Sequence, residues 1–140
     1  MFRNSHAITI EWGDCDPAGI VFYPRYFAMF DAATAFLLES ASGLTRAQLI
    51  AHYGILGWPM VDTRAVFLKP ASFDDRIVID TEVTRLGRSS FDVAHRLMKD
   101  SVLCVEATET RVWARRKMEP DGIESIPLPA ELRANLERSD

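Results

Sequence analysis

The sequence has few of the features that mark secreted or membrane-bound proteins. Among its 140 residues it has 2 cysteines, Cys15 and Cys104, too few for a disulfide framework, and both are expected to be free thiols. No apolar run approaches the roughly 18 residues that span a bilayer, and residues 1–6 lack the hydrophobic stretch of a secretory signal. We therefore expect a cytoplasmic protein with no membrane partner.

The sequence also lacks an excess of positive charge and any short metal-binding motif. Its net charge of -4 argues against a general nucleic-acid surface, although a local arginine pocket for a phosphorylated ligand is compatible with it. His6, His52 and His95 are scattered, and neither they nor the two cysteines show the spacing of metal ligands. We expect no nucleic-acid partner and no metal.

What the sequence does have is enough apolar material for one core. The hydrophobic content of 48% predicts a single domain over residues 1–140. Residues 7–12 alternate in polarity and predict a half-buried strand, with Ile8, Ile10 and Trp12 on its apolar face. Pro24 then suits the start of a long helix that ends at Ser42 and Gly43. Because this helix is apolar on nearly every side, we expect it to be central, with a sheet wrapped around it.

The remainder of the sequence predicts a short helix followed by strands. Residues 45–48 have the spacing of a capping box, and this helix is expected to end near Gly54. The short connections between the later strands predict antiparallel hairpins in sequence order, a turn is expected at 119–122, and Pro127 and Pro129 precede a short polar helix. The β-type runs lie at about 60–69, 76–85, 89–99 and 102–116. The expected fold class is α+β, an antiparallel sheet around a long central α-helix.

The segment 13–19 is the best candidate for a functional site. It brings a carboxylate, a glycine-bearing turn and a helix N-terminus together within about a dozen residues, so a base or nucleophile can face fixed N–H donors. From the residues alone, Asp16 fits two interpretations, a catalytic carboxylate or a turn former before Pro17. Asp14 is expected to order the turn by accepting backbone N–H bonds. Cys15 is flanked by carboxylates that oppose thiolate formation, so it is expected to pack rather than react.

Two other uses of an Asp-x-Asp pattern do not fit. A calcium-binding EF-hand loop that began at Asp14 would place Arg25 at its twelfth position, where a bidentate glutamate belongs. A phosphoryl-transfer aspartate usually ends a buried parallel strand of a larger α/β domain, whereas this strand alternates and no βαβ succession follows it.

The sequence resembles the 4-hydroxybenzoyl-CoA thioesterase family. The matching residues are Glu-Trp-Gly-Asp-Cys-Asp-Pro-Ala-Gly-Ile-Val at 11–21, Tyr-Pro-Arg-Tyr at 23–26 and Phe-Asp-Ala-Ala at 30–33, with weaker matches continuing along most of the chain. The resemblance implies a hotdog fold and the hydrolysis of an acyl-CoA thioester. It also implies that no metal or organic cofactor is used, and that the chain forms a homodimer or homotetramer with active sites built from two subunits.

The resemblance assigns roles to two residues of the junction. Asp16 matches the family's catalytic carboxylate, which could attack the thioester carbonyl directly or deprotonate a water molecule, and the sequence does not choose between the two. The backbone N–H of Tyr23 matches the family's oxyanion donor, and the helix dipole adds positive potential there.

Four residues are candidates for substrate contacts, and the resemblance implies two of them, Asp31 and Arg88. Asp31 matches a residue that can reach across the subunit interface, where it would favour a hydroxylated aromatic acyl group, but a salt bridge explains this charge equally well. Phe22 and Tyr26 are candidates to line the acyl pocket, although aromatic residues at this spacing are more often core. Arg88 matches a residue that holds the nucleotide phosphates, whereas Gly87 departs from the family where a second arginine can occur.

These points predict an acyl-CoA thioesterase for an aromatic or short acyl group, with 4-hydroxybenzoyl-CoA ranked first as a family expectation. One alternative is a broad-specificity thioesterase for aliphatic acyl-CoA or acyl-carrier-protein esters. The other is a non-catalytic, dimeric module that binds acyl-CoA. In each case coenzyme A belongs to the ligand and is not a cofactor.

Overall fold

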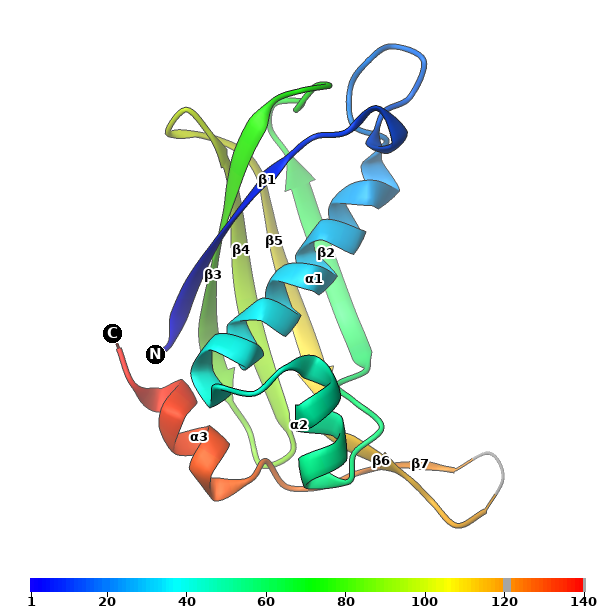
Figure 1. Cartoon of the computed structure of the whole chain (residues 1–140), viewed down its shortest axis with the longest axis vertical. Coiled ribbons are helices and arrows are strands. Elements are labelled where there is room, and N and C mark those ends of the chain that lie inside the picture. The colour runs from blue at the N-terminus through cyan, green and yellow to red at the C-terminus, as the bar shows by residue number, and fades with distance from the viewer. Residues whose placement is uncertain (120–121, 140) are drawn as a thin grey trace.

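The computed structural model describes residues 1–119 and 122–139, which form an antiparallel sheet crossed by a long helix (Figure 1). The sheet has the strand order β1-β3-β4-β5-β2. Its strands are β1 (Arg3–Thr9), β2 (Met60–Phe67), β3 (Arg76–Leu86), β4 (Ser90–Lys99) and β5 (Val102–Val112). The remaining elements are the 3-10 turn Trp12–Asp14, helices α1 (Tyr23–Ser42), α2 (Arg46–Tyr53) and α3 (Ala130–Glu137), and a small hairpin of β6 (Ala114–Arg116) and β7 (Ile123–Ser125).

Strands β3 and β4 have one buried and one exposed face, as their alternating polarity predicts. The two strands pair antiparallel, and β4 pairs in the same way with β5, so both predicted hairpins are confirmed. The apolar side chains of the inward face belong to the same apolar clusters as buried residues of α1 and form much of the core. They are Ile77, Ile79, Val83, Phe91, Val93 and Leu97.

The predicted helix limits are confirmed by their caps. Pro24 lies in the first turn of α1, and the helix ends at Gly43, which adopts the left-handed conformation with φ 73°. Helix α2 begins after Thr45, whose side chain accepts a hydrogen bond from the backbone N–H of Gln48 in the predicted capping box. The C-terminal helix α3 also forms, beginning after Pro129.

The long helix is enclosed on most sides and has one exposed strip. Phe30, Leu37 and Leu38 are fully buried on the side that faces the sheet. On another side of the helix Ala28 is exposed and Phe36 keeps 40% of its surface exposed. From Tyr26 onward, every other residue of α1 apart from Ser40 is buried or half-buried, so the expectation of a helix buried on most sides is confirmed.

The first strand lies earlier in the sequence than predicted. It spans Arg3–Thr9 rather than 7–12, because residues 3–6 pair with β3 although their polar side chains carry no strand pattern. The chain then turns at 12–14, and Trp12 is 68% exposed, in contact with the edge of the Phe73 ring, instead of lying on the buried face.

Two later expectations also need correction. Strand β2 does not precede β3 in a meander, because residues 68–75 cross the end of the sheet and leave β2 on the far edge beside β5. The predicted run 102–116 breaks at Trp113, whose backbone N–H leaves the ladder and donates to the carbonyl oxygen of Ser89. The predicted turn at 119–122 lies partly outside the described residues.

The interior consists of two apolar clusters. One surrounds Trp58, Trp113 and Leu132 near α2 and α3, and the other surrounds Tyr26 and Phe30 near the start of α1. The core residues of α1 divide between them, with Phe30 in the second cluster and Leu37 in the first. Buried polar residues come from the sheet and helix positions between these clusters, namely Thr34, Thr81, His95, Glu109 and Arg111.

Candidate active site

The segment 14–22 is a tight reversal of the chain that delivers it to the start of α1. Cys15 and Val21 form an isolated antiparallel bridge, and the backbone N–H of Asp16 donates to the carbonyl oxygen of Ile20 at 2.9 Å. Gly19 occupies the turn with φ 81°, a conformation that favours glycine. The reversal therefore fixes Asp16 within a few residues of the first turn of the helix.

The carboxylate of Asp16 is held by one oxygen and free at the other. Its Oδ1 accepts a hydrogen bond from the backbone N–H of Ala18 at 2.8 Å, which is the turn-forming contact that the sequence suggested. Within the described residues, Oδ2 has no hydrogen-bond or ion-pair partner, and the side chain is half-buried. One oxygen thus fixes the orientation of the side chain while the second is available to a substrate or water.

The backbone N–H of Tyr23 is a free donor at the helix start. The neighbouring N–H of Phe22 donates to the carbonyl oxygen of Asp14, Pro24 has no N–H, and Arg25 donates to the carbonyl oxygen of Phe22. Within the described parts of the chain no acceptor is bonded to the Tyr23 N–H. A free donor at the positive end of a helix suits a developing oxyanion.

The two residues next to Asp16 have the supporting roles that the sequence predicted. Asp14 Oδ2 accepts a hydrogen bond from the backbone N–H of Glu11 at 2.9 Å, which closes the turn. Partial burial, with the nearby carboxylates of Asp14 and Asp16, raises the pKa of the Cys15 thiol above its ordinary value. Cys15 packs against the apolar cluster around Phe30 and, like Cys104, is a free thiol, so a nucleophilic thiolate is disfavoured here.

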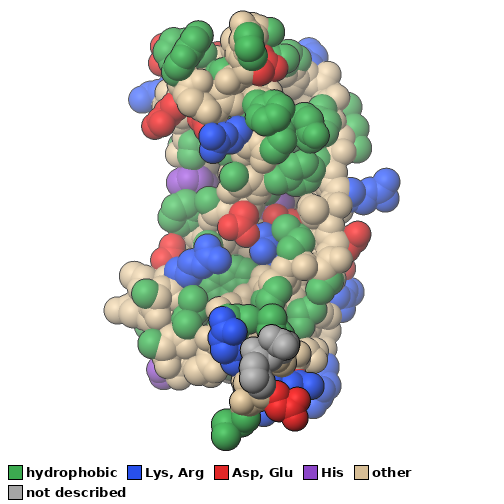
Figure 2. Space-filling model, turned by 90° about the vertical axis from the view of Figure 1, so that its right-hand side faces the viewer, with side chains coloured by type: hydrophobic (Ala, Val, Ile, Leu, Met, Phe, Trp, Pro, Cys, Tyr) green, Lys and Arg blue, Asp and Glu red, His purple; other side chains and the backbone are tan. Residues whose placement is uncertain are grey.

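An apolar groove of about 310 Å³ lies beside the start of α1. Tyr26, Tyr23, Val21 and Phe67 are among the residues that line it, and the same end of the molecule carries hydrophobic side chains on the face shown in Figure 2. The Tyr26 hydroxyl accepts a hydrogen bond from the backbone N–H of Ala71, and burial raises its pKa. Tyr26 is therefore both a core residue and a groove wall.

Phe22 lies outside that groove. Its side chain is exposed and contacts the edge of the Tyr23 ring at a centroid distance of 5.5 Å. The structure of one chain therefore brings Tyr26, but not Phe22, into the groove wall.

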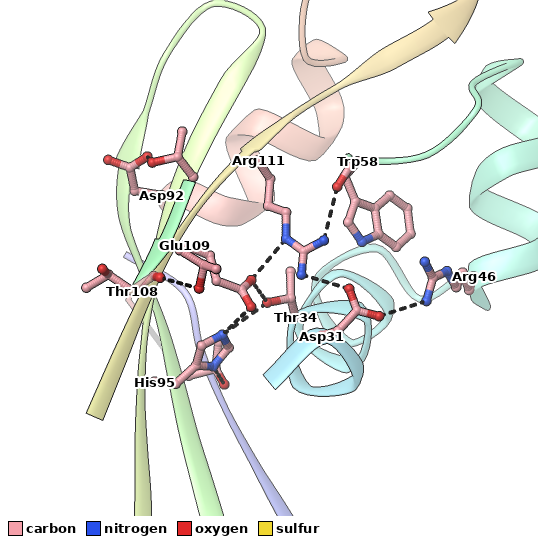
Figure 3. Close-up of polar contacts among 12 residues, drawn as sticks. Asp31, Thr34, Arg46, Trp58, Asp92, His95, Thr108, Glu109 and Arg111 are labelled. Atoms are coloured by element: carbon pink, nitrogen blue, oxygen red, sulfur yellow. Dashed lines mark hydrogen bonds and ion pairs between the residues drawn. The ribbon is translucent and has the colours of Figure 1, made fainter. Parts of the chain in front are cut away.

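Asp31 forms a salt bridge, which is one of the two roles that the sequence predicted for its charge; the other is a substrate contact. Its Oδ1 accepts a hydrogen bond from Arg111 Nη2 at 2.8 Å, and its Oδ2 lies 3.9 Å from Arg46 Nη1 (Figure 3). The side chain nevertheless keeps 44% of its surface exposed, so it remains open to a ligand. Salt bridge and substrate contact are compatible roles for this carboxylate.

Sequence reasoning missed the buried polar group behind Asp31. Glu109 accepts hydrogen bonds from Thr34 Oγ1 at 2.6 Å and Arg111 Nε at 3.0 Å, and His95 Nε2 lies 3.3 Å from its other oxygen. A signal was present, because His95, Glu109 and Arg111 occupy inward positions in the alternation of β4 and β5.

Arg88 lies at the opposite end of the sheet from Asp16. The segment that carries Asp16 pairs with Ser72, just before β3 begins, whereas Arg88 follows the end of β3, which is about 35 Å long for its eleven residues. Arg88 is exposed and forms no ion pair within the described residues. One chain therefore does not bring its own Arg88 to its own Asp16.

Comparisons with known proteins identify the family of the chain. A model of the thioesterase-like superfamily matches residues 10–136. The chain belongs to the thioesterase-like superfamily. Its relatives include 4-hydroxybenzoyl-CoA thioesterase from Pseudomonas sp. (strain CBS-3), which is 35% identical over 127 residues, covering 87% of this chain and 89% of the relative.

Solved structures of thioesterases superpose on almost the whole chain. The structure of the same Pseudomonas enzyme has a TM-score of 0.88 and 32% identity, covering 96% of this chain and 99% of its own. A 4-hydroxybenzoyl-CoA thioesterase with one aspartate replaced by asparagine and 4-hydroxybenzoyl-CoA bound also has a TM-score of 0.88. It is 30% identical, covering 97% of this chain and 99% of its own. Gentisyl-coenzyme A thioesterase has a TM-score of 0.83 and 29% identity, covering 95% and 99% of the two chains.

Membership of the superfamily confirms two expectations from the sequence. The chain has the hotdog fold, and it is a thioester hydrolase of the acyl-CoA thioesterase type.

No helix in the described residues is long and apolar enough to cross a membrane. In the same residues, no three His, Cys, Asp or Glu side chains are grouped as a metal site.

Proposed function

We propose that this thioesterase hydrolyses a hydroxylated aromatic acyl-CoA, first of all 4-hydroxybenzoyl-CoA, to the free acid and coenzyme A. The observation that carries the proposal is the pair of free groups at one chain reversal, the Asp16 Oδ2 and the Tyr23 N–H. The relative at 35% identity is a 4-hydroxybenzoyl-CoA thioesterase, which supports the choice of acyl group. The aspartate-to-asparagine variant solved with that ester supports an aspartate in the chemistry.

In the proposed reaction, the thioester carbonyl lies between Asp16 and the Tyr23 N–H. Asp16 Oδ2 attacks the carbonyl carbon, or removes a proton from a water molecule that attacks it. The Tyr23 N–H stabilises the oxyanion of the tetrahedral intermediate, the carbon–sulfur bond breaks, and coenzyme A leaves as a thiolate that takes up a proton. Water then hydrolyses the mixed anhydride if Asp16 was the nucleophile. A single turnover in ¹⁸O-labelled water distinguishes the routes, because only the anhydride route can place an unlabelled Asp16 oxygen in the product acid.

The acyl group is proposed to occupy the apolar groove beside α1. Tyr26 and Phe67 would contact the aromatic ring, with Phe22 closing over it from the exposed side. Asp31 of a second copy would accept a hydrogen bond from the ring hydroxyl, because its carboxylate is ionically paired yet still exposed.

A second copy of the chain is part of the proposal for two reasons. The pantetheine arm is shorter than β3, so a substrate at Asp16 cannot reach Arg88 of the same chain. Arg88 can therefore hold the nucleotide phosphates of a substrate only when that substrate is bound at Asp16 of another copy. In addition, β2 is an edge strand, so one side of its backbone is available to pair with another strand, and Val61, Val66 and Phe67 on it are exposed. We therefore propose a homodimer as the smallest active unit, which a homotetramer would contain.

The proposed reaction uses no cofactor, and coenzyme A enters only as part of the substrate. A cytoplasmic location belongs to the same proposal and is consistent with the free thiols of Cys15 and Cys104. No nucleic-acid or membrane partner is proposed.

The test is thiol release from a panel of CoA esters: 4-hydroxybenzoyl, benzoyl, gentisyl, butyryl and palmitoyl. We expect the hydroxylated aromatic esters to give the highest kcat/KM. Asp16→Asn should lower kcat by at least about a hundredfold, because the amide is neither a base nor a nucleophile but still accepts the hydrogen bond from Ala18. A matched control is Asp14→Asn, which changes a turn carboxylate without altering the reacting group.

Each competing function has its own result in this panel. Highest activity on palmitoyl-CoA would replace the aromatic substrate with a broad aliphatic one. Tight binding of CoA esters without thiol release would leave the non-catalytic module as the explanation. Unchanged turnover by folded Asp16→Asn would remove the proposed mechanism.

A further inference from the structure

Between the two apolar clusters lies a set of buried charges that stability alone does not explain. Glu109 and Arg111 are almost fully buried, with His95, Thr34 and Thr81 beside them. Replacing a buried ion pair with apolar side chains of similar volume is often neutral or stabilising, because desolvation offsets the attraction. The charges therefore call for a role other than holding the core together.

Every polar group of this set has a defined partner. His95 Nδ1 lies 2.8 Å from Thr81 Oγ1, and His95 Nε2 lies within hydrogen-bond distance of Thr34 and Glu109. Because a carboxylate only accepts hydrogen bonds, the contact with Glu109 places a proton on His95 Nε2. The imidazole ring also stacks on Phe30 at 4.9 Å. The set is thus rigid, and it fixes the carboxylate of Glu109.

Arg111 connects this rigid set to the surface. Its Nε donates to Glu109, its Nη1 to the carbonyl oxygen of Trp58 at 3.3 Å and its Nη2 to Asp31 at 2.8 Å, while only 5% of the side chain is exposed. A guanidinium held at three sides cannot follow a moving partner. Asp31 is therefore held in one orientation by a group that is itself immobile (Figure 3).

Arg46 completes the surroundings of Asp31 from α2. Its guanidinium lies over the Trp58 ring at 5.1 Å and 3.9 Å from Asp31 Oδ2, a distance that leaves this oxygen without a close hydrogen bond. Asp31 is consequently oriented through Oδ1 and still able to accept a hydrogen bond at Oδ2. In Figure 2, acidic and basic side chains meet near the middle of the face shown.

We propose that Arg111 is a positioning residue for acyl-group selection, which fixes Asp31 so that its free oxygen accepts the ring hydroxyl of the substrate. This inference rests on the proposed function, in which Asp31 receives that hydroxyl. A fixed carboxylate accepts a charge-assisted hydrogen bond without losing side-chain freedom. Arg111 thereby sets the preference for hydroxylated over unhydroxylated aromatic esters, although it does not contact the substrate.

The test compares the ratio of kcat/KM for 4-hydroxybenzoyl-CoA to that for benzoyl-CoA. Asp31→Asn should lower this ratio about tenfold, as expected for loss of a hydrogen bond to a charged group. Glu109→Gln combined with Arg111→Met removes both buried charges together, so no buried charge is left unpaired, and should lower the ratio by a similar factor. Arg111→Lys keeps a positive charge and should fall between wild type and that double variant.

Adding Asp31→Asn to the double variant should cause no further fall, because both changes remove one function. The matched control is Arg3→Met. It removes an exposed arginine whose Nη2 lies 3.1 Å from Oε1 of Glu82, a residue of β3. The kcat/KM ratio of this control should equal that of wild type. If the double variant fails to fold, Arg111→Lys decides the question through the same ratio.

The outcomes separate this inference from the proposed function. Wild-type protein that hydrolyses neither ester would remove the proposed function and this inference with it. Wild-type activity on both esters, with equal losses on both in the Arg111 variants, would reduce Arg111 to a structural residue and overturn the inference alone. A lower ratio in Asp31→Asn but not in the Arg111 variants would do the same.

Discussion

Arg88 lies beyond one end of strand β3 and Asp16 lies beside the other, so the two residues of one chain cannot serve the same substrate molecule. If Arg88 binds the nucleotide of a substrate at another copy, two defective variants should complement each other. Mixed oligomers of Asp16→Asn and Arg88→Ala, formed by refolding or coexpression, contain sites with Asp16 from one variant and Arg88 from the other. We expect such mixtures to regain the wild-type KM. Their kcat should be only a fraction of the wild-type value, because only some of the sites combine both intact residues.

The controls for this complementation are the two variants alone and a mixture made without subunit exchange. Sedimentation or light scattering should give a mass of at least two chains for each. A mixed oligomer whose only active sites keep the raised KM of Arg88→Ala would show that Arg88 does not act across copies.

Arg88→Ala by itself should act on the nucleotide part of the substrate. Arg88 is exposed and forms no ion pair in the described residues, so its removal disturbs no internal contact of its side chain. We expect KM to rise for full CoA esters by about tenfold and to change little for truncated pantetheine esters, which lack the nucleotide phosphates. Steady-state kinetics on both ester series measures the difference, and equal effects on the two would contradict phosphate binding.

The oxyanion role of the Tyr23 backbone can be tested by removing its N–H. Proline is tolerated in the first helical turn, and Phe22 already has extended dihedrals, φ -67° and ψ 120°, that suit a residue before proline. Tyr23→Pro should therefore fold but lower kcat by about 10²- to 10³-fold through loss of one oxyanion donor. Tyr23→Ala is the matched control, because it removes the same side chain and keeps the N–H. Similar kcat values for the two variants would exclude the backbone donor.

The sequence predicted those parts of the fold and site that depend on local signals. The capping residues Thr45 and Gly43 and the alternation of β3 and β4 depend on neighbours within a few residues, so their positions were correct. The turn contacts of Asp14 and Asp16 are local in the same way. The resemblance to a known family supplied what local signals could not, namely the catalytic assignment.

Features that depend on distant pairing were missed. Arg3 and its polar neighbours form a strand only because β3 offers an edge, and Trp12 leaves the predicted strand because the chain reverses there. The buried contact between Glu109 and His95 joins two strands and a helix, which no periodicity within one segment can indicate. The distance between Arg88 and Asp16 follows from the sheet topology, which sequence order did not predict.

The stability of the fold should decrease in acid because several carboxyl groups are paired in the folded state. A hydrogen bond from Arg85 lowers the pKa of Asp92 below its ordinary value of 3.8, against the effect of burial and with a further bond from Thr110. A folded-state pKa below the unfolded one means that the unfolded chain binds protons more readily. The stabilisation is therefore complete above about pH 4 and is lost as the pH falls through the folded-state value.

Asp92→Asn tests this relation. Because the Arg85–Asp92 pair is partly exposed, with side chains 46% and 30% accessible, its contribution should be about 0.5–1 kcal/mol after screening by solvent and salt. Thermal unfolding measures the effect: the decrease in Tm from pH 6 to pH 3 should be smaller in Asp92→Asn than in wild type. Glu106→Gln, which removes an exposed carboxylate with no ion pair in the described residues, should show the wild-type loss. Equal losses in Asp92→Asn and wild type would mean that Asp92 does not contribute to the acid sensitivity.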